Sequence, residues 1–111
     1  MTTFRFRCYA VFVSAALVVH GALAADTKDP NMVVIDNFSF RPQTLTVAAG
    51  TKVTWVNHDD VPHTVVSTDK KTFVSSALDT DEKFIHAFTT PGTNDYYCSV
   101  HPHMKGRVIV Q

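Results

Sequence analysis

The chain has 111 residues with 10 basic and 10 acidic side chains, so it carries no net formal charge and has room for one small domain. Its lysines and arginines are scattered along the sequence, which excludes the basic patch that nucleic-acid binding requires.

The N-terminal segment has the features of a targeting signal. Two arginines near the start are followed by an apolar run over residues 8–19 and by an Ala-Leu-Ala motif at residues 22–24. This order is typical of a secretory signal peptide with its cleavage site, and the apolar run is too short to span a bilayer comfortably. We therefore expect a signal peptide at residues 1–24 that is removed after Ala24. An uncleaved membrane anchor is the alternative interpretation.

The remaining residues, 25–111, lack helical periodicity and contain short runs rich in β-branched and aromatic side chains. Turn-forming residues separate the runs, among them Pro91-Gly92, which suits the central positions of a type II turn. This pattern predicts a single all-β domain over residues 25–111, with the fold of a Greek-key β-sandwich. The expected strands lie at residues 33–35, 38–40, 45–47, 53–56, 64–66, 84–88, 95–98 and 105–110.

Four residues form a candidate metal site. Cys98, His101 and Met104 make a Cys-x-x-His-x-x-Met run near the C-terminus, and His63 precedes an expected strand. Two imidazoles, a thiolate and a weak axial thioether are the ligand set of a blue-copper electron-transfer site. The soft sulfur atoms favour Cu(I) and the imidazoles hold Cu(II), so the set tolerates both oxidation states. The sequence therefore predicts one copper ion per chain, bound by loops at one end of the sandwich.

Cys98 is the only cysteine of the expected mature chain, because Cys8 belongs to the expected signal peptide. A single cysteine in an exported protein cannot form an internal disulfide, and metal ligation would explain its presence. A role for Cys98 as a catalytic nucleophile beside a histidine is the alternative, but it leaves Met104 without a function.

Other histidines fit ordinary structural roles. His58 and His103 lie in polar loops, where exposure to solvent is typical. His86 shares a strand face with Phe84 and Phe88, which indicates a half-buried strand residue rather than a ligand.

The pattern Asn57-x5-His63, followed by the loop Cys98-Ser-Val-His101-Pro-His-Met104, resembles the cupredoxins, and within them the amicyanins and related plastocyanin-like proteins. The short spacing of the loop is the specific part of this resemblance, which extends over nearly the whole mature chain. It implies His63, Cys98 and His101 as equatorial copper ligands and Met104 as the axial ligand.

The resemblance also implies roles for residues next to the ligands. The amide of Asn57 would tie the two ligand-bearing loops together, and the backbone N–H of Thr64 would donate to the Cys98 sulfur. The C-terminal histidine ligand would reach the surface within an apolar patch, the exit of the electron, formed here by Val61, Pro62, Val100 and Pro102.

Two positions depart from the family pattern. His103 stands where amicyanins usually carry Phe, which makes the rim of the patch more polar and leaves the choice of partner open. Asn94 stands where a Tyr is common, which affects only local packing.

The resemblance implies a periplasmic carrier that shuttles single electrons between redox proteins, with a dehydrogenase as donor or a c-type cytochrome as acceptor. We expect a monomer that is not an enzyme, has no nucleic-acid partner and has no stable membrane association after signal cleavage. A periplasmic protein that binds and delivers copper is the alternative. The ligands look caged and methionine is sparse, with 3 in the chain, which favours the carrier.

Overall fold

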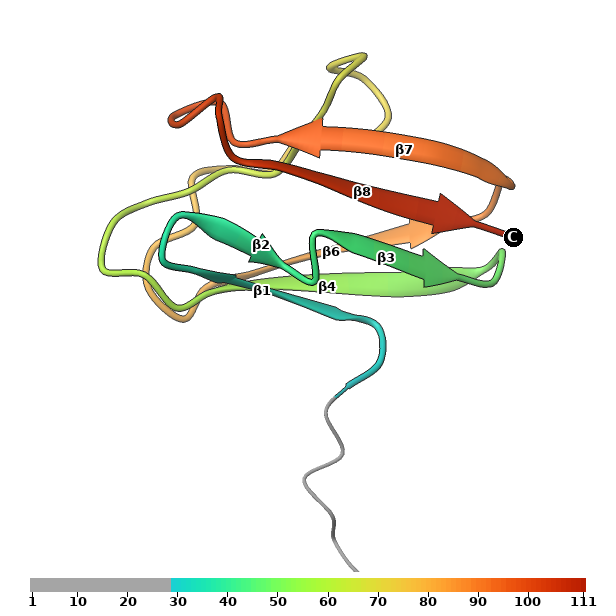
Figure 1. Ribbon diagram of the computed structural model, residues 1–111, viewed down its shortest axis with the longest axis horizontal. Helices are drawn as coiled ribbons and strands as arrows, with labels where there is room; N and C mark the ends of the chain where they lie inside the picture. The colour runs from blue at the N-terminus through green and yellow to red at the C-terminus, as the bar shows by residue number, and fades with distance from the viewer. Residues whose placement is uncertain (1–28) are drawn as a thin grey trace, which may run out of the picture.

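The computed structural model describes residues 29–111, which form two layers of strands (Figure 1). The expected signal peptide at residues 1–24 lies outside the described residues. Within this part of the chain, no helix is long and apolar enough to cross a bilayer. The strands are β1 (Met32–Asp36), β2 (Ser39–Arg41), β3 (Thr44–Val47), β4 (Thr51–Asn57), β5 (Val66–Ser67), β6 (Lys83–Phe88), β7 (Gly92–Tyr97) and β8 (Lys105–Val110).

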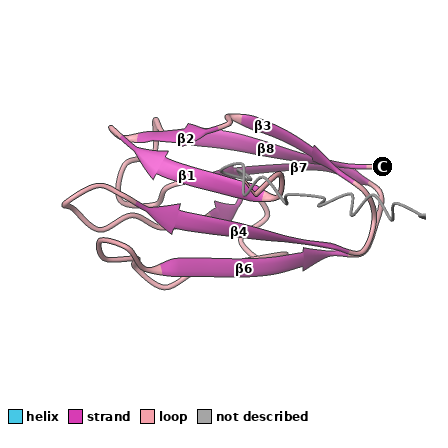
Figure 2. Ribbon diagram, turned by 90° about the horizontal axis from the view of Figure 1, so that it is seen from below, coloured by secondary structure: helices cyan, strands magenta, loops and turns pink. Residues whose placement is uncertain are grey.

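The strands form two 4-stranded sheets in the orders β2-β1-β4-β6 and β3-β8-β7-β5. The pairs β1–β4 and β3–β8 are parallel, and the remaining pairs are antiparallel. Strands of both sheets run along the same long direction of the molecule (Figure 2). Parallel neighbours require the chain to cross from one sheet to the other, as in a Greek key. The prediction of an all-β sandwich is therefore confirmed.

The core lies between the sheets and is centred on Trp55 of β4. Val53 and Trp55 of β4 are fully buried, whereas Lys52 is exposed. Successive side chains along a strand point to opposite faces of the sheet, so this alternation is expected. The Trp55 ring lies 5.5 Å from that of Tyr96 on the opposite sheet and 5.8 Å from that of Phe73. These ring contacts join the two sheets and fix the sandwich that carries the end loops.

The short strand expected at residues 64–66 was wrong in position, because β5 begins only at Val66. The backbone N–H of Thr64 donates to the Cys98 sulfur, and that of Val65 donates to the Ser75 hydroxyl. These two residues therefore bind side chains rather than a neighbouring strand.

The connection at Pro91-Gly92 is not the expected type II turn. Gly92 has a φ of 147°, whereas the glycine of a type II turn has a φ of about 80°. The reason is topological, since the chain passes here from β6 in one sheet to β7 in the other and does not reverse within a hairpin.

Candidate metal centre

The predicted ligands meet at one end of the sandwich. His63 Nδ1 lies 3.7 Å and His101 Nδ1 lies 4.0 Å from the Cys98 sulfur. All three ligand atoms lie within 4.8 Å of one another. Metal bonds of about 2.0–2.3 Å from nitrogen and sulfur donors to a central ion are compatible with these separations. The side chains are thus already converged on one point.

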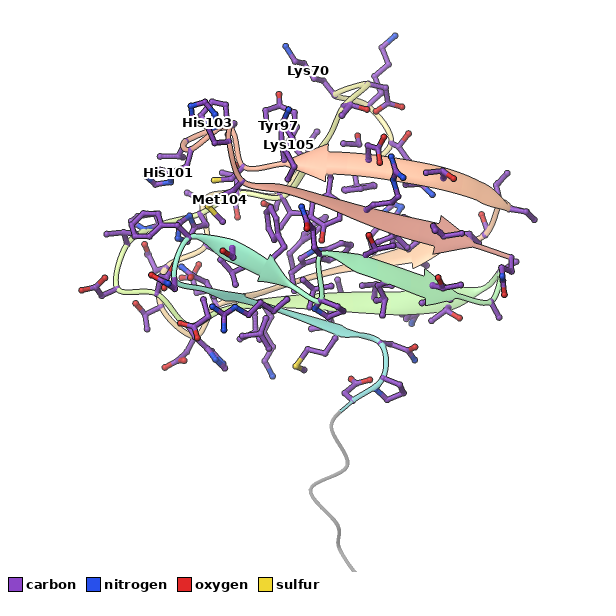
Figure 3. All side chains as sticks on the ribbon, in the orientation of Figure 1. Lys70, Tyr97, His101, His103, Met104 and Lys105 are labelled. Carbon is purple, nitrogen blue, oxygen red and sulfur yellow. The ribbon has the colours of Figure 1, made fainter. Side chains whose placement is uncertain are left out.

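Three of the candidates come from the loop between β7 and β8, where Figure 3 shows His101 and Met104 together at the end of the molecule. The backbone N–H of Cys98 donates to the Met104 carbonyl at 3.0 Å, and the N–H of Met104 donates to the His101 carbonyl at 2.9 Å. Cys98 and Met104 are buried, whereas His101 is partly exposed. The hydrogen-bonded loop therefore directs a thiol and a thioether inward and leaves one imidazole at the surface.

The fourth candidate, His63, is fully buried, and both its backbone and its ring make hydrogen bonds. Its N–H and carbonyl exchange hydrogen bonds with Leu78 at 3.1 and 2.7 Å. Its ring has Nδ1 towards the Cys98 sulfur and Nε2 at 2.8 Å from a carboxylate oxygen of Asp59. With the proton on Nε2, the lone pair of Nδ1 is free to bind a metal.

Thr64 joins the two loops that carry the ligands. Its backbone N–H lies 3.4 Å from the Cys98 sulfur, which is the hydrogen bond expected from the sequence. Its hydroxyl lies 2.7 Å from the Ser99 hydroxyl and accepts the Ser99 backbone N–H at 2.8 Å. A donor directed at a thiolate lowers the electron density on sulfur, so this contact would tune the potential of a metal bound there.

Asn57 is fully buried, but its contacts differ from those expected. Its side-chain amide donates to the carbonyls of Val61 and Leu78 at 2.9 and 2.8 Å. Asn57 thus joins its own loop to the segment at Leu78. The tie between the two ligand loops, which we expected from this amide, is made instead by Thr64.

Asp59 was missed by the sequence analysis. Its carboxylate accepts the backbone N–H groups of Asn37 and Phe38 at 2.7 and 2.9 Å in addition to facing His63. Burial raises the pKa of the Asp59 carboxyl, but hydrogen bonds from Phe38, Asn37 and His63 outweigh it, so the pKa lies below its ordinary value. A carboxylate four residues before a ligand histidine was the available signal, because such a group commonly holds the far nitrogen of the ring.

Phe38 was also missed as a neighbour of the site. Its ring centroid lies 5.3 Å from that of His63 and 5.1 Å from that of His101, edge-on in both cases. Of the side chains expected to form the apolar patch, Pro62, Val100 and Pro102 are exposed and Val61 is partly exposed, and Phe38 adds an exposed aromatic ring in contact with His101. The patch around His101 stays a prediction.

The remaining histidines lie outside the ligand set. His58 and His103 are exposed, and Figure 3 shows His103 on the same loop as Met104. His86 is half-buried between Phe73 and Phe88, and burial lowers its pKa.

The donor set fits copper. Two imidazole nitrogens and one thiol sulfur surround a common point, and a buried thioether lies on the same loop. Zinc and iron sites also use imidazole and thiolate, but a weak axial thioether beside a trigonal His₂Cys set is diagnostic of blue copper. The fold and the site therefore define a β-sandwich with a copper centre of the electron-transfer type.

Comparison with known proteins agrees with this class. The family model of the cupredoxin-like domain matches residues 8–110. Amicyanin-alpha of Methylorubrum extorquens is 33% identical over 109 residues, covering 92% of each chain. A purple cupredoxin from Nitrosopumilus maritimus superposes with a TM-score of 0.67 at 35% identity, over 72% of this chain and 98% of that one. A copper-containing nitrite reductase from Thermus scotoductus superposes with a TM-score of 0.69 at 34% identity, over 74% of this chain but only 22% of the reductase.

The chain belongs to the cupredoxin-like family. This membership confirms the resemblance seen in the sequence, and copper is the cofactor that the family and the donor set together indicate.

Proposed function

We propose that this protein is a periplasmic blue-copper electron carrier in which His63, Cys98, His101 and Met104 bind the metal. The observation that supports it most directly is the convergence of two Nδ1 atoms and one sulfur within 4.8 Å at the end of a rigid sandwich. Copper bound there supplies a one-electron couple between Cu(I) and Cu(II).

The residues around the ligands suit rapid electron transfer because they hold one geometry. Backbone hydrogen bonds close the loop from Cys98 to Met104, and Leu78 and Asp59 hold His63 at opposite ends of the residue. A preorganised set of donors needs little rearrangement when its charge changes, so the barrier to gaining or losing an electron is low.

The exit for the electron is His101. It is the partly exposed member of the ligand set, whereas His63, Cys98 and Met104 are buried. Its chain neighbour Val100 is 53% exposed, and Phe38, whose ring contacts that of His101, is 48% exposed, so apolar side chains beside His101 can meet the surface of another redox protein. A reduced donor passes one electron to the oxidised carrier, and the reduced carrier passes it to an oxidised acceptor, with no atoms exchanged.

The location and partners are part of the proposal. The signal-like residues 1–24 support export to the periplasm, where a dehydrogenase would be the donor and a c-type cytochrome the acceptor. The buried ligands support a carrier rather than a copper-delivery protein, which needs an exchangeable site. We propose no enzymatic role, in keeping with the similarity of the chain to amicyanins and plastocyanins.

An optical spectrum of the copper-loaded protein tests the ligand set. We expect an intense visible band from charge transfer between the Cys98 sulfur and Cu(II), and its loss in Cys98→Ser. His103→Ala is the matched control in the same loop and should keep the band. A colourless wild-type Cu(II) complex, or a coloured Cys98→Ser protein, would refute the proposed site.

Two further measurements test the carrier and its location. A reversible one-electron wave in voltammetry with slow copper loss supports a carrier, whereas rapid transfer of copper to an apo-acceptor supports delivery. The intact mass of the exported protein should correspond to a chain that begins at Ala25, and a mass that retains residues 1–24 would contradict periplasmic release.

A further inference from the structure

The turn between β1 and β2 has an unfavourable residue at its tip. Two residues, Asn37 and Phe38, connect the strands, and both have positive φ, at 50° and 57°. This is the backbone of a type I′ turn, for which Asn-Gly is the preferred pair. Asn suits its position, but an aromatic side chain with positive φ is strained, and a glycine would relieve the strain.

The turn is held by the carboxylate of Asp59, which also faces a candidate ligand. One oxygen of the Asp59 carboxylate accepts the N–H of Asn37 at 2.7 Å, and the other accepts the N–H of Phe38 at 2.9 Å. The second oxygen also lies 2.8 Å from His63 Nε2. A single carboxylate therefore fixes the turn and one candidate copper ligand relative to each other.

The ring of Phe38 contacts the imidazole rings of both His63 and His101. The centroids of Phe38, His63 and His101 are separated by 5.3, 5.1 and 5.1 Å, so the three rings form a nearly equilateral triangle. Phe38 meets the two histidine rings at 90° and 86°, the edge-on arrangement that aromatic pairs favour. Phe38 is 48% exposed and does not belong to the buried core cluster of the sandwich, and among the described residues its aromatic neighbours are the two candidate ligands.

We propose that Phe38 is a positioning residue that clamps the two imidazole ligands, and in particular keeps His101 directed at the metal. The inference rests on the proposed ligand set. His63 is also held by Leu78 and Asp59, whereas the ring of His101 is partly exposed and depends on its neighbours. A residue that costs the turn stability and contacts both ligands is best explained by that function.

Two glycine substitutions in the same turn separate the effect of losing the Phe38 ring from the effect of relaxing the turn backbone. Phe38→Gly relieves positive φ and removes the ring, whereas Asn37→Gly relieves positive φ and keeps the ring. Phe38→Tyr keeps the ring edge and can point its hydroxyl to solvent. Urea unfolding of the copper-free proteins checks folding, and we expect a midpoint for Phe38→Gly that is no lower than that of the wild type.

The decisive measurement is the rate at which a Cu(I) chelator removes copper from the reduced protein. We expect Phe38→Gly to release copper about tenfold faster than the wild type, since the edge-on contact with His101 corresponds to a factor of up to about ten, while His63 is still held by Leu78 and Asp59. Asn37→Gly and Phe38→Tyr should stay within about twofold of the wild type. A wild-type rate for Phe38→Gly, or an equal acceleration in Asn37→Gly, would overturn the clamp. If Phe38→Gly does not fold, Phe38→Leu replaces it with the same criterion.

Nuclear magnetic resonance of the copper-free protein gives a readout that does not depend on the metal. We expect contacts between the Phe38 ring and the ring protons of both histidines, and sharper, averaged His101 signals in Phe38→Gly but not in Asn37→Gly. Unchanged His101 signals would contradict the clamp. A wild-type protein that shows these contacts but binds no copper would instead refute the proposed function, and only the packing of Phe38 on the two histidine rings would remain.

Discussion

Asp59 contacts three neighbours of the candidate metal site through its carboxylate and its backbone: His63, the β1–β2 turn and Asn57. It faces His63 Nε2, and it accepts two backbone N–H groups from the turn that carries Phe38. The backbone N–H of Asp59 itself donates to the Asn57 side chain at 2.9 Å. The contacts with His63 and Asn57 pair polar groups that are fully buried, so the orientation of the candidate ligand and local stability have the same cause.

The role of Met104 at the site can be tested separately from the roles of the two histidines and the cysteine. Met104 is 6% exposed, and as the proposed axial ligand it would bind the metal weakly. We expect Met104→Gln to retain one equivalent of copper, to shift the visible spectrum and to lower the reduction potential, because an amide oxygen is a harder donor that favours Cu(II).

Met104→Leu is the matched variant, since it keeps the apolar volume and removes the donor. Its potential should rise, because Cu(II) loses a ligand. Copper titration and voltammetry check both variants. Loss of copper binding in Met104→Gln would mean that the thioether is a principal ligand. Equal reduction potentials in the two variants would mean that Met104 is not a ligand.

At the scale of strands, the pairing of β7 with β8 determines where the ligand loop begins and ends. Tyr97 pairs with Lys105 and Tyr96 with Gly106, so Cys98 and Met104 leave the ladder opposite each other. The two residues are then close enough for the Cys98 N–H to bond the Met104 carbonyl. A one-residue slip would reverse which side chains face the core, and the buried Tyr96 prevents it.

Gly106 is required in this pair by space. A Cβ at this position would lie 2.2 Å from Cζ of Tyr96, whose ring is 1% exposed and packs at 4.7 Å from Phe40. The ring also contacts those of Trp55 and Phe73, so moving it would disturb the core, and we expect Gly106→Ala to lower the free energy of unfolding by about 2–3 kcal/mol through overpacking.

Urea unfolding of the copper-free protein measures this loss, and a double-mutant cycle locates its cause. In a Tyr96→Leu background the same Gly106→Ala change should cost much less, because the ring atoms that it meets are gone. An equal cost in both backgrounds would mean that the backbone of β8, and not the Tyr96 ring, explains the loss.

At the scale of the molecule, the aromatic core holds the two sheets together, and the sheets in turn anchor the end loops. Trp55 contacts rings from both sheets, and Phe73 extends the cluster to His86 and Phe88. A domain of this size buries a modest fraction of its surface, so a bound metal should add appreciably to its stability.

His86 makes the stability of the sandwich depend on pH. Burial between aromatic rings holds its pKa below the ordinary value of about 6.5, so below that pH the unfolded chain binds a proton more readily than the folded one. Stability is therefore fully present above pH ~6.5 and falls as the pH decreases through the window between the two pKa values.

His86→Gln tests this dependence in the copper-free protein. Between neutral and mildly acidic pH, the wild type should lose more unfolding free energy than the variant, by no more than about 0.5 kcal/mol because solvent screens the partly exposed ring. Urea titrations at a series of pH values measure the difference. A difference that does not change with pH, or that grows in the opposite direction, would show that His86 is not the responsible group.

The sequence by itself predicted the candidate ligands and the class of fold. Cys98, His101 and Met104 lie within one short loop, so their spacing alone requires them to share a site, and alternating apolar residues predicted most strands. The strand at residues 64–66 was misplaced because its N–H groups bind the Cys98 sulfur and the Ser75 hydroxyl, which no local pattern reveals.

Only the tertiary structure decided how the ligands are held. Asp59 reaches the β1–β2 turn across 21 and 22 residues of sequence, and Phe38 meets His63 and His101 across still longer separations. These contacts exist because β1 lies parallel to β4 in the same sheet, which brings the turn after β1 beside the loop after β4. Side chains from distant segments meet only when sheet pairing is complete, and local propensity carries no information about that pairing.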